Sequence, residues 1–281
     1  MVKDAFKEHG LPEDFARRLG RIVEVRGPVV DARFEPDRLP ALLSAGRRVI
    51  AYDRRGHGRS DRPGGGYDFD TLADDLATLI NQLGLEHVTL VGHSLGCREI
   101  VRYLTRHGSA RVERIVFVGT TTPFLPRTDD NPDGIEPALI QANYDAVRAN
   151  LPKWCTDFEA AGPYFGTTTK DVRGLVEWTI RMIVDTPLFV LLETLRQMTS
   201  VDMRPELPRI DVPALIIHGD ADASAPIALT GRKTARLMPH ARLIEYAGAG
   251  HGLYASEHER LNADLLAFLA EGNIRPTTRA A

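Results

Sequence analysis

The pentapeptide Gly-His-Ser-Leu-Gly at residues 92–96 has the clearest chemical meaning in this sequence. It follows an apolar run at residues 88–91 and precedes a helix-like segment at residues 97–106. A strand, a tight turn and a helix in that order would push the Ser94 hydroxyl out of the top of a sheet, with the Leu95 N–H free to donate to an oxyanion. We interpret Ser94 as a nucleophile. An ordinary strand-to-helix turn with a capping serine is the alternative.

A serine hydroxyl is a weak nucleophile until a base removes its proton, and candidate partners follow later in the chain. Two apolar runs, at residues 212–217 and 242–246, each lead into a polar loop, the first with Asp222 and the second with His251 between two glycines. Open α/β sheets build their sites in such loops, so we predict that His251 is the base and that Asp222 orients it. Asp220 competes for the role of the acid, with bonding to loop amides as its alternative role. The alternative for His251 is a solvated surface histidine.

In these features the chain resembles the α/β-hydrolases, and within them the bacterial cofactor-free haloperoxidases, perhydrolases and arylesterases. The matching stretches are residues 48–60, the turn at Ser94, residues 106–112 and residues 210–268. The resemblance implies that the three side chains form a catalytic triad, with no metal ion and no organic cofactor. It also implies an α/β-hydrolase fold, in which a mostly parallel sheet carries helices on both faces and an inserted helical cap.

The N-terminal part of the chain departs from that family pattern. Family members normally place a His-Gly loop after the third strand, and a backbone N–H of that loop is the second oxyanion donor. Residues 29–37, which come directly after Gly27-Pro28, contain no His-Gly pair, so the second donor is expected from Ala32 or Arg33. Residues 20–42 instead weakly resemble the N-terminus of ATP synthase β subunits, but the chain has no phosphate-cradling Gly-x-x-x-x-Gly-Lys-Ser/Thr motif. Whether the N-terminal part is a fusion or a replaced segment, its sequence allows a β-hairpin that turns at Gly27-Pro28.

Strand-like and helix-like patterns alternate along most of the chain, which predicts a largely parallel sheet with helices on both faces. The predicted strands are residues 48–52, 88–91, 115–118, 214–218 and 243–246. Apolar residues at helical spacing predict helices at residues 72–83 and 257–270. We divide the chain into an N-terminal extension (1–20), an α/β-hydrolase core (21–121 and 210–272), a helical cap (122–209) and a flexible tail (273–281).

Residues 122–209 interrupt the alternation with several helix-like segments separated by prolines. They resemble the helical cap of the same superfamily, which covers the serine and forms much of the substrate pocket. The residues expected to line this pocket are His93, Phe124, Trp154, Phe158, Phe165, Trp178, Met182, Phe189 and Leu192. For each of them, packing inside the protein is the alternative role. Together they predict a mostly apolar pocket and a small, uncharged acyl substrate.

The composition is that of an ordinary globular enzyme. The chain has 281 residues, of which 43% are hydrophobic and 26% charged, with a formal net charge of −3 that offers no basic surface to nucleic acid. No apolar run approaches the roughly 20 residues of a membrane span, and the start lacks a signal-peptide pattern, which predicts a cytoplasmic protein. Cys97 and Cys155 provide no disulfide framework.

We therefore expect a serine hydrolase that cleaves small carboxylic esters through an acyl-enzyme on Ser94. Lactone hydrolysis and peracid formation with haloperoxidase activity use the same triad and stay open. The alternative from another class is a non-catalytic hydrolase scaffold or a fusion product with a damaged oxyanion site. The expected partner is a small-molecule ester, with no nucleic acid and no membrane, and homo-oligomer formation stays open.

Overall fold

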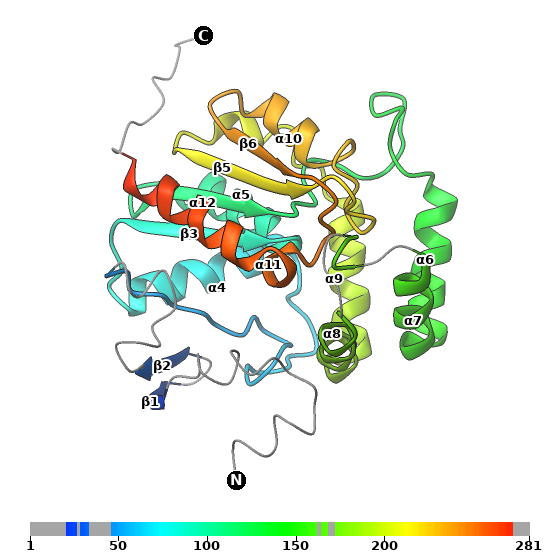
Figure 1. Ribbon diagram of the computed structural model, residues 1–281, viewed down its shortest axis with the longest axis horizontal. Helices are drawn as coiled ribbons and strands as arrows, with labels where there is room; N and C mark the ends of the chain where they lie inside the picture. The colour runs from blue at the N-terminus through cyan, green and yellow to red at the C-terminus, as the bar shows by residue number, and fades with distance from the viewer. Residues whose placement is uncertain (1–20, 27–28, 34–45, 162–163, 168–171, 272–281) are drawn as a thin grey trace.

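The computed structural model describes residues 21–26, 29–33, 46–161, 164–167 and 172–271 of the chain (Figure 1). Its two N-terminal strands, β1 (Arg21–Arg26) and β2 (Val29–Arg33), pair antiparallel, with Arg26 opposite Val29. The hairpin that the sequence allows is therefore present, although its turn at Gly27-Pro28 lies outside the described residues. The hairpin is a separate two-stranded sheet.

Four further strands form one parallel sheet in the order β3-β4-β5-β6. They are β3 (Val88–His93), β4 (Val112–Val118), β5 (Ala214–Gly219) and β6 (Arg242–Tyr246). Four of the five predicted strands are therefore confirmed. Since the strands are parallel, the loops after β3, β5 and β6 all emerge at the same edge of the sheet.

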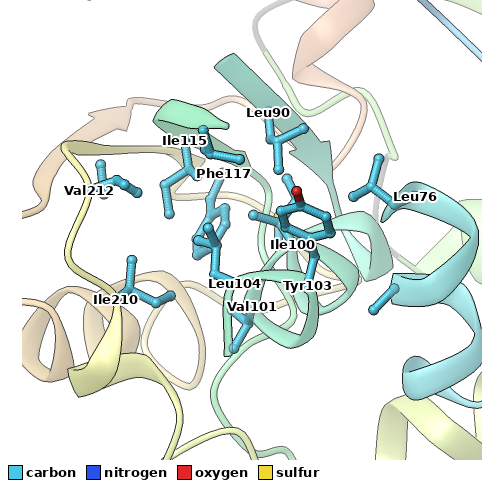
Figure 2. Packing of buried hydrophobic residues seen from close by; sticks show 14 of the residues in the cluster. Leu76, Leu90, Ile100, Val101, Tyr103, Leu104, Ile115, Phe117, Ile210 and Val212 are labelled. Carbon is cyan, nitrogen blue, oxygen red and sulfur yellow. The ribbon is translucent and has the colours of Figure 1, made fainter. Parts of the chain in front are cut away.

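Helices cover both faces of this sheet, as predicted. The helices packed on it are α4 (Phe69–Gln82), α5 (Leu95–His107), α10 (Gly231–Leu237), the short α11 (Leu253–Ser256) and α12 (His258–Ala270). Alternate side chains of β4 point to opposite faces of the sheet. Ile115 and Phe117 pack with α4 and α5 on one face (Figure 2). Val116 and Val118 pack with α12 on the other face. Burial of each such side chain stabilises the fold by roughly 1.5–3 kcal/mol.

The strand predicted at residues 48–52 does not form, and this prediction is wrong. Only Tyr52 makes an isolated bridge, and Val49 remains 48% exposed. An apolar run favours a strand, but a strand also needs a neighbour that takes its backbone hydrogen bonds. No such neighbour lies among the described residues. There β3 is the edge of the parallel sheet, and its Val91 is 54% exposed.

Between β4 and β5 the described residues form a group of four helices and a short 3₁₀ turn. These are α6 (Pro137–Ala149), α7 (Leu151–Ala161), α8 (Arg173–Asp185), α9 (Leu188–Ser200) and the turn at Leu207–Arg209. The four helices lie beyond the carboxyl ends of the strands (Figure 1), where they share a small core around Val147, Leu151 and Cys155. Among the described helices, none has both the length and the apolar character to cross a membrane.

Candidate active site

Ser94 occupies the sharp turn between β3 and α5. Its backbone has φ 55° and ψ −117°, a conformation that a residue with a side chain rarely adopts. The surroundings hold it there: the Ser94 N–H donates to the Val118 carbonyl at 3.0 Å, and the Ser94 carbonyl accepts from the Cys97 N–H at 3.1 Å. A β-carbon on Gly92 would lie 2.7 Å from the carbonyl carbon of Gly96, so the turn requires a glycine at position 92.

The Leu95 N–H is a candidate oxyanion donor because Leu95 is the first residue of α5, and the first N–H groups of a helix have no partner within it. The structure does not bring the other two predicted donors to Ser94. Ala32 and Arg33 lie in β2, which pairs with β1 and not with the parallel sheet. Figure 1 shows this hairpin well separated from the end of β3.

Asp222 and His251 are brought together by the loops after β5 and β6. Oδ2 of Asp222 lies 2.7 Å from Nδ1 of His251, and Oδ1 accepts from the Ala225 N–H at 2.7 Å. Both side chains are buried. Burial raises the pKa of Asp222, but hydrogen bonds from His218 and His251 outweigh it and hold this pKa well below its usual range. The carboxylate is therefore ionised, and it lies within hydrogen-bonding distance of Nδ1 of His251.

Asp220, the competing acid, points elsewhere. It is exposed, and its Oδ1 accepts the Gly248 N–H at 2.6 Å. Bonding to a loop amide is the alternative role considered for it from the sequence. The structure thus brings Asp222, and not Asp220, into hydrogen bonding with His251.

His93 contacts the loop that carries His251. Its Nε2–H donates to the backbone carbonyl of His251 at 2.9 Å, and the two rings stand 4.6 Å apart. Burial, with a contribution from the nearby His251, lowers the pKa of His93 to about 3, so its ring is neutral. His93 is not among the residues that line the cavity described next; it supports the loop that carries His251.

Ser94 and His251 both line a cavity of about 360 Å³. Its walls come mainly from the helices after β4 and are mostly apolar. Three of the predicted pocket residues, Trp154, Phe158 and Phe165, are part of them. Further apolar wall residues are Leu125, Ile135, Leu139, Ile140, Val176, Ile180, Ile183, Leu195 and Met198.

The other predicted pocket residues lie outside this cavity. Trp178 and Met182 are 45% and 42% exposed, because they share the outer face of α8 while Val176, Ile180 and Ile183 on its other side line the cavity. Phe124 packs against the guanidinium of Arg204. Phe189 is 43% exposed and contacts the ring of Tyr67 edge-on. Leu192 packs in the small core shared by the four helices α6 to α9.

Polar wall residues were missed by the sequence analysis. They are Thr121, Asn143, Glu159, Tyr164, Thr179, Thr199 and Ser224. Thr121 follows β4 and Ser224 follows Asp222, so their positions just after strands were the signal that could have found them. In the described part of the chain, His, Cys, Asp and Glu side chains form no group of three or more that could hold a metal ion.

Comparison with known proteins agrees with this fold. The family model described as alpha/beta hydrolase fold matches residues 9–257. A non-heme haloperoxidase from Rhodococcus erythropolis is 37% identical over 231 residues, which are 81% of this chain and 84% of that protein. A bifunctional esterase/perhydrolase from Acinetobacter calcoaceticus is 33% identical over 233 residues, which are 81% of this chain and 83% of that protein. The crystal structure of a bromoperoxidase from Bacillus anthracis matches with a TM-score of 0.77 and 34% identity. The match covers 83% of this chain and 85% of the bromoperoxidase chain.

Proposed function

Because this chain belongs to the α/β-hydrolase family and is similar to its non-heme haloperoxidases, we propose that it hydrolyses small carboxylic esters through an acyl-enzyme on Ser94. The observation that carries the proposal is the shared cavity of Ser94 and His251, together with the 2.7 Å contact between His251 Nδ1 and Asp222. A nucleophile, a base and an orienting acid then meet at one apolar pocket.

In the proposed reaction, the Ser94 hydroxyl attacks the ester carbonyl carbon while Nε2 of His251 takes its proton. The oxyanion of the tetrahedral intermediate accepts a hydrogen bond from the Leu95 N–H. His251 then returns the proton to the leaving alcohol, and the acyl group stays on Ser94. A water molecule, deprotonated by His251, releases the acid. Asp222 remains ionised throughout and stabilises the imidazolium.

The cavity supports a small acyl substrate. Its volume of about 360 Å³ lies at the lower end of ordinary ligand pockets, and its wall is mostly aliphatic and aromatic. Such a wall binds an alkyl or aryl acyl group by apolar burial, and it leaves orientation to the few polar groups near Ser94.

Perhydrolysis is a second reaction that the same residues support, and one relative is a bifunctional esterase/perhydrolase. Hydrogen peroxide in place of water would attack the acyl-enzyme, and the product would be a peracid. The peracid would then oxidise halide ions away from the protein, so haloperoxidase activity would need no further residue. Lactone hydrolysis would follow the same steps with a tethered leaving group.

The proposal is tested with p-nitrophenyl acetate and a serine-directed sulfonyl fluoride. We expect the reagent to label Ser94 and to stop hydrolysis, and Ser94→Ala to lower kcat by about 10⁴-fold or more, because a triad acts as a unit. Ser224→Ala is the matched variant, since Ser224 is a second serine of the cavity wall, and this variant should still be labelled at Ser94. A label on Ser224, with Ser94→Ala fully active, would contradict the assignment. A folded wild-type protein without turnover on any ester would favour the non-catalytic scaffold.

A further inference from the structure

We propose that residues 164–167, which lie between α7 and α8, hold the catalytic histidine in place, and that Gly166 is a positioning residue for the reaction. The inference rests on the proposed function, because it takes His251 as the base. It assigns a segment from the group of helices between β4 and β5 to the residues that align the proposed triad.

Residues 164–167 run along the loop that carries His251. The Gly252 N–H donates to the Tyr164 carbonyl at 2.7 Å, and the Thr167 N–H donates to the Gly248 carbonyl at 2.8 Å. These two hydrogen bonds lie on either side of His251 in the sequence. We call the pairing of residues 164–167 with residues 248–252 the clasp.

The centre of the clasp is a backbone contact that only glycines permit. Gly166 forms an antiparallel bridge with Ala249 and has φ +81°, the left-handed region that favours glycine. A β-carbon on Gly166 would overlap the Gly248 carbonyl oxygen and the Gly250 amide nitrogen. A β-carbon on Gly250 would in turn overlap the amide nitrogen of Gly166. Since the two backbones touch here, a side chain at position 166 must push the segments apart.

The clasp is one of three restraints on His251. Asp222 holds its Nδ1, and the Nε2–H of His93 holds its backbone carbonyl at 2.9 Å. The clasp fixes the residues on both sides, and the ring of Tyr164 packs edge-on against the His251 ring with centroids 5.4 Å apart. The loop around His251 is rich in glycine, so it needs such restraints to keep Nε2 in one place.

The same segment also faces the substrate cavity. Tyr164 and Phe165 belong to its wall, and the Tyr164 N–H donates to Oε2 of Glu159 at 2.9 Å. A part of the cavity wall is therefore hydrogen-bonded to the loop that carries His251. We expect loss of the clasp to act mainly on kcat, because a displacement of about 1 Å in a catalytic group can lower the rate by about 10²-fold.

The test compares Gly166→Ala with Gly65→Ala. A β-carbon on Gly65 meets nothing within 4 Å, which makes this glycine the matched control. For Gly166→Ala we expect kcat on p-nitrophenyl acetate to fall by about 10²-fold, with KM much less affected. The downfield proton signal of His251 Nδ1–H should broaden or disappear, and amide exchange at Gly252 and Thr167 should accelerate. Gly65→Ala should match the wild type in all three measurements.

A second variant keeps the inference testable if Gly166→Ala fails to fold. Thr167→Pro removes the N–H that donates to Gly248 without adding a β-carbon at position 166, and it should change the same three measurements in the same direction. A folded clasp variant with wild-type kcat and a wild-type His251 signal would overturn the inference. The proton signal and amide exchange do not depend on turnover. They therefore report on the clasp even if Ser94→Ala shows that the proposed function is wrong.

Discussion

Nε2 of His218 lies 3.2 Å from Oδ2 of Asp222, the same carboxylate oxygen that Nδ1 of His251 approaches at 2.7 Å. His218 Nε2 also lies 2.8 Å from the Ala225 carbonyl, which can only accept, so Nε2 carries a proton. One carboxylate oxygen of Asp222 thus faces nitrogen atoms of two histidines, both of them buried. This arrangement explains why the pKa of Asp222 is lowered although burial alone would raise it.

The role of His218 predicts a pH-dependent effect of its removal. A carboxylate with a lowered pKa in the folded state stabilises the fold above its unfolded pKa of about 4, and this stabilisation is lost as the pH falls through the folded pKa. His218→Leu removes one donor and raises the folded pKa of Asp222. We therefore expect the Asp222 carboxyl group to titrate at a higher pH in the variant than in the wild type, and the difference in unfolding free energy to shrink only below the variant's folded pKa. A carboxyl ¹³C NMR titration of Asp222 in the two proteins measures the change in pKa.

His218→Gln provides the control for that comparison, because its side-chain amide keeps an N–H donor in place of Nε2–H. It should retain part of the lowering of the Asp222 pKa. An Asp222 carboxyl group that titrates at the same pH in His218→Leu and in the wild type would show that His218 acts only by packing.

The two candidate acids predict unequal effects on turnover. Asp222→Asn removes the charge that orients His251 and stabilises its imidazolium, which should lower kcat by about 10⁴-fold. Asp220→Asn should do much less, since an amide oxygen can still accept the Gly248 N–H. Steady-state kinetics with p-nitrophenyl acetate compares the two variants, and circular dichroism checks that both are folded. The opposite ranking would transfer the acid's role to Asp220.

The positions of Ser94 and His251 and most of the sheet could be predicted from the sequence because their signals are local. A strand, a turn with glycines and a helix are contiguous around Ser94, and the apolar runs that became β4 and β5 are buried on both faces. Spacing could not separate Asp222 from Asp220, which lie in one loop. What separates them is tertiary: Asp222 reaches His251, whereas Asp220 reaches Gly248.

The parts that the sequence could not predict depend on distant neighbours. Residues 48–52 have the composition of a strand but lack a described strand to pair with. Helix α8 is apolar on more than one face, so the sequence does not indicate that Trp178 faces outward while Ile180 faces the cavity. The clasp joins Gly166 to Ala249, which are far apart in the sequence, and no local pattern indicates their contact.

The cavity predicts selectivity for the acyl group of the substrate. Its wall is mostly apolar and also contains Glu159, so an anionic acyl group meets both desolvation and like charge. We expect p-nitrophenyl butyrate to have a much higher kcat/KM than the p-nitrophenyl monoester of succinate. Chain length should matter as well, since each methylene changes discrimination by roughly 1–3 kcal/mol in a fitted apolar pocket.

Glu159→Gln separates charge from size in that comparison. It keeps an oxygen that can accept the Tyr164 N–H, and it removes the negative charge from the wall. The succinate monoester should gain relative to butyrate in this variant. Equal kcat/KM values for acetate, octanoate and succinate esters in the wild type would argue that the cavity does not hold the acyl group.

The last prediction concerns Thr179, whose buried hydroxyl has no hydrogen-bond partner among the described residues. Thr194, on the next helix, is equally buried, but its hydroxyl donates to the Val190 carbonyl at 2.9 Å. Valine has nearly the shape of threonine without the hydroxyl. Thr179→Val should therefore raise the free energy of unfolding by about 1 kcal/mol or more, whereas Thr194→Val should lower it by about 1 kcal/mol.

Both substitutions replace one β-branched residue by another within a helix, so effects of helix propensity largely cancel between them. Chemical denaturation at pH 7 gives the two free energies. If Thr179→Val destabilises the protein as much as Thr194→Val, the Thr179 hydroxyl has a partner in solution, and a water molecule in the adjoining cavity becomes the natural candidate. Hydrolysis of p-nitrophenyl butyrate by the same variant then reports whether that hydroxyl also serves the substrate: a raised KM in a stabilised protein would place it in contact with the acyl group.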